Sequence, residues 1–183
     1  LNGGLRTVAR NPYLYGADIT TPTLLKQEYR ERAPNCISPN KVAVFDIETD
    51  VVNGTGDMPI CMSLTFKDRV FLAASKGWVG TNPNYVAEVQ AAAKKYTGDH
   101  IEARNITIEV MVCRTAGEMI VETFKRAHLW RPDFVTVWNI DFDIPKCLKV
   151  LKDEGIDPAQ VFSDPSVPEK FKFFRYKQGN ERT

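Results

Sequence analysis

The stretch VAVFDIET, residues 42–49, is an almost continuous apolar run that ends in two acidic residues. A run of this kind is typical of a strand buried on both faces of a sheet. Side chains two apart on a strand point to the same face, so Asp46 and Glu48 lie on one face together. Val42 and Val44 share that face, and we therefore expect the strand to end in two carboxylates beside the core.

The pair Asp46 and Glu48 is a candidate metal site. Neighbouring carboxylates repel each other and are costly to remove from water. A divalent cation relieves both costs, and hard cations such as Mg²⁺ prefer oxygen ligands. The alternative is that the strand simply emerges there into a solvated, acidic loop, because Asp-x-Glu alone is common.

The segments around this strand alternate between the two regular structures. Their periodicity and turn residues predict strands over 59–66, 69–74, 106–112 and 134–138, and helices over 83–96, 116–130 and about 143–154. We expect Asn82 to cap the first of these helices, and Thr115 and Glu118 to form a capping box before the second. Three strands followed by alternating helix and strand indicate an α/β domain with a mixed sheet.

Composition narrows the class of protein. The chain has 183 residues, 43% of them hydrophobic and 26% charged, which is typical of a globular domain with a proper core. Its formal net charge of +1 excludes a nonspecific polyanion binder, so nucleic-acid contacts must come from local patches. No apolar run is long enough to span a membrane. The four cysteines form no CxxC pair, which indicates reduced thiols in a cytoplasmic protein.

Residues 1–40 differ from the rest of the chain. They are polar and contain four prolines, and a short helix capped by Thr21 is expected over residues 22–32. We interpret this region as an N-terminal arm or the edge of a neighbouring domain, followed by an organised domain over residues 41–183. The first residue is not Met, so we expect the chain to be a piece of a longer protein.

The stretch WNIDFDIP, residues 138–145, is a second cluster of polar side chains, between a predicted strand and a predicted helix. In open α/β sheets, functional sites collect at the carboxyl ends of strands. Asp141 or Asp143 could instead cap the helix. Capping accounts for one aspartate, but not for Asn139 and Phe142 in the same turn.

These two stretches carry a resemblance to a known family. Residues 45–49, FDIET, resemble the first motif of the proofreading 3′→5′ exonuclease domains of family B DNA polymerases, and residues 139–143, NIDFD, resemble their second motif. The lead-in over residues 118–124 and 132–139 is similar too. NPYLY at 11–15 resembles the segment that precedes the exonuclease in such polymerases. The resemblance covers roughly residues 10–155 and implies an RNase H-like mixed sheet flanked by helices, in a truncated exonuclease domain.

The resemblance also implies a metal-dependent reaction. The expected cofactors are two Mg²⁺ or Mn²⁺ ions, which promote hydrolysis of the 3′-terminal phosphodiester of single-stranded DNA. In this sequence Asp46 would bridge both ions, Glu48 would hold the ion on the nucleophile side, and Asp143 would hold the second.

The resemblance places three further residues beside the substrate. Thr49, Asn139 and Phe142 would face the terminal nucleotides of a single-stranded 3′ end, with Phe142 stacking on a base. The alternative for Phe142 is packing in the core below the site. The partners implied are DNA and the remaining polymerase domains, with no membrane.

The sequence departs from the family pattern at two points. The spacer between Asn139 and Phe142 has two residues where many relatives have three, which leaves Asp141 as a competitor for the metal. The third motif, Tyr-x-x-x-Asp, is absent, and the related His-x-x-x-x-Asp pattern occurs only at His128 and Asp133, in the wrong order. We therefore expect the sequence to stop before the third motif and to hydrolyse DNA poorly or not at all.

Other interpretations remain open. Residues 169–182 contain five basic and two acidic residues with interleaved aromatics, which suits either a DNA-backbone contact or a strand without its partner. A free-standing RNase H-like or DnaQ-like nuclease would need a fourth acidic ligand, and Asp164 is the late aspartate available. A catalytically silent scaffold that binds DNA or a protein is the third alternative.

Overall fold

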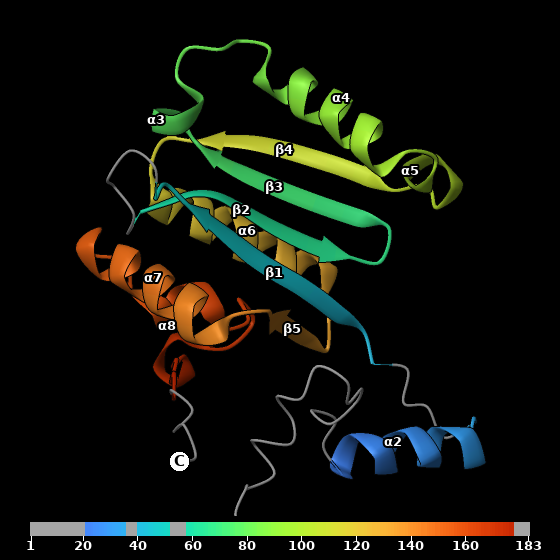
Figure 1. Cartoon of the computed structure of the whole chain (residues 1–183). Helices are drawn as coiled ribbons and strands as arrows, with labels where there is room; N and C mark the ends of the chain where they lie inside the picture. Colours follow the sequence, from blue (N-terminus) through green and yellow to red (C-terminus); the bar gives the residue numbers. More distant parts are fainter. Residues whose placement is uncertain (1–20, 36–39, 52–57, 178–183) are drawn as a thin grey trace, which may run out of the picture. The chain divides into compact units, whose positions relative to one another are not determined.

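Figure 1 shows a computed structural model of the chain, which describes residues 21–35, 40–51 and 58–177. The chain divides into two units, residues 1–39 and 40–183. In the first unit, helix α2 (Thr21–Arg32) exposes Leu24, Leu25 and Tyr29. Thr21 is the first residue of this helix, whereas the sequence predicted it as the cap. The NPYLY segment at residues 11–15 lies outside the described residues.

The second unit is built on a five-stranded mixed sheet. Its strands are β1 (Val42–Thr49), β2 (Pro59–Phe66), β3 (Arg69–Ser75), β4 (Thr107–Cys113) and β5 (Phe134–Val137). Their order across the sheet is β4-β3-β2-β1-β5. The pairs β1–β2 and β2–β3 are antiparallel, and β1–β5 and β3–β4 are parallel. The predicted α/β mixed sheet with flanking helices is therefore confirmed.

The two faces of β1 have opposite environments, which corrects the prediction of a strand buried on both faces. Ala43, Phe45 and Ile47 are buried in the core. Val42 and Val44 are 43% and 49% exposed, so their face is open rather than packed beside the core. Asp46 and Glu48 lie on this open face. A continuous apolar run cannot distinguish the two cases, because valine is favoured in strands whether or not it is covered.

Helix α6 (Ala116–Trp130) lies across the covered face of the sheet and buries Met119, Ile120 and Phe124 against it. Helix α7 (Ile140–Asp153) adds Cys147, Val150 and Leu151 to the same core. The short helix α8 (Pro158–Phe162) packs with α6 and α7. Thr115 caps α6 as predicted, with its hydroxyl accepting from the backbone N–H of Glu118 at 3.1 Å. The Glu118 carboxylate in turn accepts from the backbone N–H of Arg114 at 2.6 Å and interacts with the backbone N–H of Thr115, as expected of a capping box.

The remaining helices lie between β3 and β4 in the sequence: α3 (Lys76–Val79), α4 (Tyr85–Thr97) and α5 (His100–Ala103). Helix α4 begins two residues later than predicted, and Asn84 takes the N-cap position. Asn82 instead receives a hydrogen bond from the backbone N–H of Asn84 and donates to Glu88. In Figure 1, α4 runs along the β4 edge of the sheet.

The end of the described chain, residues 169–177, pairs with no strand of the sheet. It contains a 3₁₀ turn, η1 (Glu169–Phe171), and an extended segment. Phe174 packs on Phe162 with ring centroids 4.4 Å apart, and Phe162 meets Phe124 edge to face at 4.5 Å. This aromatic row fixes the segment against α6 and α8.

The structure bears on two expectations from composition, the absence of a membrane-spanning segment and the reduced state of the cysteines. Within residues 21–35, 40–51 and 58–177, no helix is both long and apolar enough to cross a membrane. Cys61, Cys113 and Cys147 are free thiols, whereas Cys36 lies outside the described residues.

Candidate metal centre

The carboxyl ends of β1 and β5 bring the two motifs together. These strands are parallel neighbours, with Phe45 beside Val137 at the end of the ladder. Asp46 and Glu48 follow on β1, and the chain after Val137 passes directly into α7. Parallel neighbours end at the same edge of a sheet, so the two motifs lie at one edge although about 95 residues separate their acids.

Asp143 is buried in the first turn of α7 and is only 2% exposed. Asn139 holds the N-cap position, so Asp143 lies inside the helix and is not its cap. The backbone N–H of Asn139 donates to the Asp143 carboxylate. The other carboxylate oxygen, Oδ2, has no hydrogen-bond partner among the described residues. A buried carboxylate oxygen without a partner is rare in folded proteins and needs a physical explanation.

The three acids interact electrostatically. Burial raises the pKa of Asp143 above its ordinary value, and the charges of Asp46 and then Glu48 raise it further. A buried carboxylate whose ionisation is disfavoured by two neighbouring carboxylates suits a divalent cation with oxygen ligands. In the described part of the chain, no three such side chains form a ready-made metal-binding group.

Cys61 is a further titratable group beside the acids. The β1–β2 register places it directly opposite Glu48, and Ser63 opposite Asp46. Burial raises the pKa of the Cys61 thiol to about 11, with Glu48 and Asp46 adding to the shift. Neither motif indicates this neighbour, because the pairing of β1 with β2 depends on residues outside both of them.

The predicted substrate residues lie next to the acids in the chain and are accessible at the surface. Thr49 is half-buried at an irregularity in the β1–β2 ladder, and Asn139 is exposed. Phe142 is 39% exposed, with the Lys146 ammonium 5.3 Å from its ring centroid. Phe142 therefore lies at the surface and not in the core.

Sequence reasoning missed one aromatic residue of this surface. Trp138 stands between β5 and Asn139 and is 95% exposed. Exposing the large apolar surface of an indole ring to water costs free energy. A fully exposed Trp beside polar side chains therefore indicates a binding surface. The signal was its position, immediately before the second motif.

Asp141 is engaged elsewhere. The Tyr176 hydroxyl donates a hydrogen bond to Asp141 Oδ1 at 2.6 Å, which links the chain's late segment to the start of α7. This bond raises the pKa of Tyr176 to about 12. Asp141, considered above as a competitor for the metal, is thereby paired with a phenol rather than grouped with the three acids.

The other acidic and histidine residues considered above have structural partners. Asp164 accepts hydrogen bonds from the backbone N–H and hydroxyl of Ser166 at 2.8 and 2.6 Å. These bonds, then Arg131 and His128, lower its pKa. Asp133 accepts from the backbone N–H of Lys41, and His128 meets the Val161 carbonyl at 2.9 Å. None of these contacts reaches the three acids, so they do not supply the fourth ligand that a free-standing nuclease would need.

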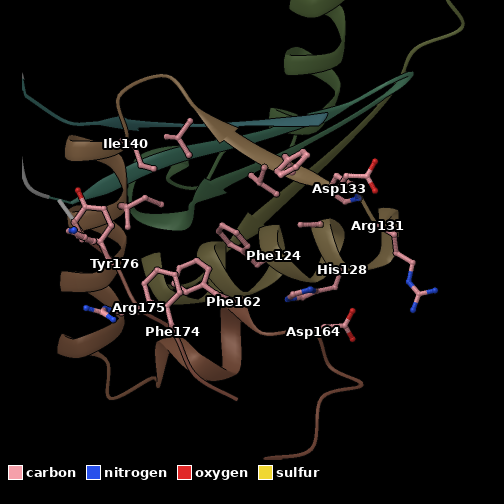
Figure 2. A pocket seen from close by; sticks show the side chains of 17 residues that line it. Phe124, His128, Arg131, Asp133, Ile140, Phe162, Asp164, Phe174, Arg175 and Tyr176 are labelled. Carbon is pink, nitrogen blue, oxygen red and sulfur yellow. The ribbon is translucent and has the colours of Figure 1, made fainter. Parts of the chain in front are cut away.

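Asp164 instead lines a cavity elsewhere in the domain. This cavity of about 800 Å³ lies between the exposed edge of β5, the end of α6 and the segment around Phe174 (Figure 2). Figure 2 shows Phe124, Phe162 and Phe174 along one wall, with Arg131, Asp133 and Asp164 gathered at one end. Asp46, Glu48 and Asp143 are not among its lining residues.

A scan against models of protein families gives no match for this chain, and neither does a search of curated proteins.

Proposed function

We propose that this chain carries the metal-binding part of a proofreading 3′→5′ exonuclease of a family B DNA polymerase. The observation that carries the proposal is the buried, unpartnered Oδ2 of Asp143, placed within the electrostatic field of Asp46 and Glu48. A structural carboxylate would have acquired hydrogen-bond donors in such a position. The two motifs that contain these acids supply the resemblance to the family.

The chain's own residues would divide the work as follows. Asp46 and Glu48 would hold ions from the open face of the sheet, and Asp143 would hold one from the helix side. When bound, two divalent ions supply a nucleophile near neutral pH and stabilise the attacking and leaving oxygens. The fourth acid and the tyrosine of the family's third motif have no match in the sequence pattern, so hydrolysis by this chain should be slow.

The surface residues suit a single-stranded end. Phe142 and Trp138 expose aromatic rings within five residues of each other, on either side of the Asn139 amide. Stacking of a base on an aromatic ring contributes about 1–3 kcal/mol and tolerates any sequence, as proofreading requires. This surface would bring the terminal nucleotide to the edge where the three acids lie.

The test uses the whole chain and a short single strand of DNA labelled at its 3′ end, with Mn²⁺ present. We expect Mn²⁺-dependent binding of the strand, and any slow release of label to come from the 3′ terminus. Asp46→Ala should abolish both the binding and the release. Glu154→Gln is the control, because it also removes a carboxylate but at the start of α6, and it should leave both intact.

Two results would count against the proposal. One is binding of the strand that is independent of Mn²⁺ and unaffected by Asp46→Ala, which would favour a silent DNA-binding scaffold. The other is no binding of Mn²⁺ or of DNA under any condition. Rapid release of nucleotides would instead show that our expectation of weak activity is wrong, while supporting the exonuclease.

A further inference from the structure

Cys61 lies on the open face of the sheet, directly across the β1–β2 ladder from Glu48. Directly opposite residues on one face of an antiparallel pair have Cβ atoms about 4.5–5.5 Å apart. Asp46 follows along the same face, opposite Ser63. A soft sulfur donor therefore stands against two hard carboxylate donors, at the edge where Asp143 is buried.

An independent observation shows that this edge is built for a ligand. Asp143 is 2% exposed, and its Oδ2 has no partner among the described residues. The two acids of β1 are the charges that act on it, so its unpartnered oxygen belongs to the same site. Cys61 is thus a thiol on the same sheet edge as three carboxylates, although no three of these side chains form a ready-made metal-binding group among the described residues.

On the basis of the proposed metal site, we propose that Cys61 is an additional ligand for thiophilic divalent ions. Zn²⁺ or Cd²⁺ would bind through the Cys61 sulfur together with Glu48, and would compete with Mg²⁺ or Mn²⁺. Bond lengths of about 2.3 Å to sulfur and 2.0–2.2 Å to a carboxylate oxygen suit a cross-strand pair. Binding breaks the S–H bond, forms a sulfur–metal bond and releases the proton to solvent, with no change of oxidation state.

This donor set would make the site sensitive to the kind of metal present. Carboxylates alone discriminate little between divalent ions, whereas a thiolate selects softer ions over Mg²⁺ and Mn²⁺. An ion fixed by sulfur on the Glu48 side would occupy the position that the nucleophile requires. We therefore expect Zn²⁺ and Cd²⁺ to inhibit rather than support the proposed reaction.

The test follows the ultraviolet sulfur-to-cadmium charge-transfer absorption of the full chain, with Cys36→Ser introduced to remove the thiol outside the described residues. Cd²⁺ should produce a band that saturates at one equivalent, and Cys61→Ser should abolish it. Cys147→Ala is the matched control, because this thiol lies in the fully buried core near Asp143 and should not contribute. Glu48→Gln should weaken Cd²⁺ binding at least about tenfold.

Mn²⁺ binding, measured in the same variants by calorimetry, separates this inference from the proposed function. If Mn²⁺ binding depends on Asp46 but no charge-transfer band is lost in Cys61→Ser, the role of Cys61 is wrong and the metal site stands. A band that vanishes in Cys61→Ser but is unchanged in Glu48→Gln would show a thiol acting alone, and would also overturn the inference. If Mn²⁺ does not bind at all, the proposed function fails, whatever Cd²⁺ does.

Discussion

Helices α6 and α7 each begin beside a carboxylate. The two acids come from opposite ends of α7, and they differ in whether their oxygens have hydrogen-bond partners. At the start of α6, Glu154 accepts hydrogen bonds from the Thr115 hydroxyl at 2.7 Å and from the backbone N–H of Gly117 at 2.9 Å. At the start of α7, Asp143 is buried with one oxygen unpartnered among the described residues. Glu154 completes a helix N-terminus, which favours negative charge.

The difference teaches how to separate structural from functional acids. Both carboxylates interact with helix N-termini, so position near a helix start does not distinguish them. Only Asp143 lies in the field of two further carboxylates, and that field makes its burial unfavourable. An acid whose partners are all present stabilises the fold, whereas an acid held without them is positioned for something that binds.

The largest expected effect is on the α7 side of this comparison. Asp46→Asn removes a charge that Asp143 and the proposed ions both experience, and it should weaken Mn²⁺ binding about 100-fold or more. Calorimetric titration measures this directly. Glu154→Gln is the control, and the comparison is broken if both variants lose Mn²⁺ to the same degree.

The next effect tests the α6 side. A Cβ added at Gly117 would lie 2.3 Å from Glu154 Oε2 and 2.8 Å from Ile156 Cδ1. Gly117→Ala should therefore displace the Glu154 carboxylate and destabilise the domain by about 1 kcal/mol, because the loss of its hydrogen bonds outweighs the gain in helix propensity. Thermal unfolding measures the loss, while Mn²⁺ affinity should stay unchanged.

Gly77→Ala is the matched control for this prediction, because its added Cβ would meet only Ser75 Oγ at an ordinary 3.6 Å. The account would be contradicted by a Gly117→Ala variant that is as stable as Gly77→Ala, since the Glu154 contact would then contribute nothing to α6.

A smaller effect concerns the surface beside Asp143. Phe142→Ala should weaken Mn²⁺-dependent binding of a single strand about tenfold, because one stacked base contributes about 1–3 kcal/mol. The measurement is fluorescence anisotropy with a labelled oligonucleotide. Phe173→Ala, a still more exposed aromatic on the late segment, is the control that should change little. Equal losses in both variants would remove the distinction between the two surfaces.

The smallest effect is expected at Asp141, a further acid near this helix start. Tyr176→Phe removes its hydrogen bond and should lower the Tm slightly without changing Mn²⁺ affinity. The raised pKa of Tyr176 gives a pH signature: the stabilisation is fully present below the ordinary value of 10.0 and is lost as pH rises through about 12. Ultraviolet titration of the tyrosines checks it. The bond would be refuted if the phenol lost in Tyr176→Phe were one that titrates at the ordinary value.

The parts of the fold that local chemistry determines were predictable from the sequence. The hairpin of β2 and β3 follows from two apolar runs around Lys67 and Asp68, and the hydroxyl of Thr115 marks the start of α6. The burial of β1 was predicted wrongly, because its open face carries Val42 and Val44, whose type does not report whether a neighbouring element covers them.

The site was predicted only in part, for reasons of distance along the chain. Asp46, Glu48 and Asp143 belong to recognisable motifs, and the parallel pairing of β1 with β5 brings them to one edge. The neighbours of Cys61 and Glu154 could not be predicted. Those of Cys61 depend on the register between β1 and β2, and those of Glu154 on a hydrogen bond to Gly117, 37 residues away in the chain. The burial of Asp143 needs the whole packing of α7.

The central claim is that Asp143 is held for a cation shared with Asp46 and Glu48. Without metal, the raised pKa of Asp143 means that the folded protein loses stability from this group as pH rises through its folded-state pKa.

The most direct measurement compares the unfolding free energy of the wild type and Asp143→Asn at pH 7, without and with Mn²⁺. We predict that Asp143→Asn is more stable than the wild type in the metal-free protein, because the amide carries no charge to bury. Saturating Mn²⁺ should stabilise the wild type alone and reverse this order. An order that Mn²⁺ leaves unchanged would contradict the account.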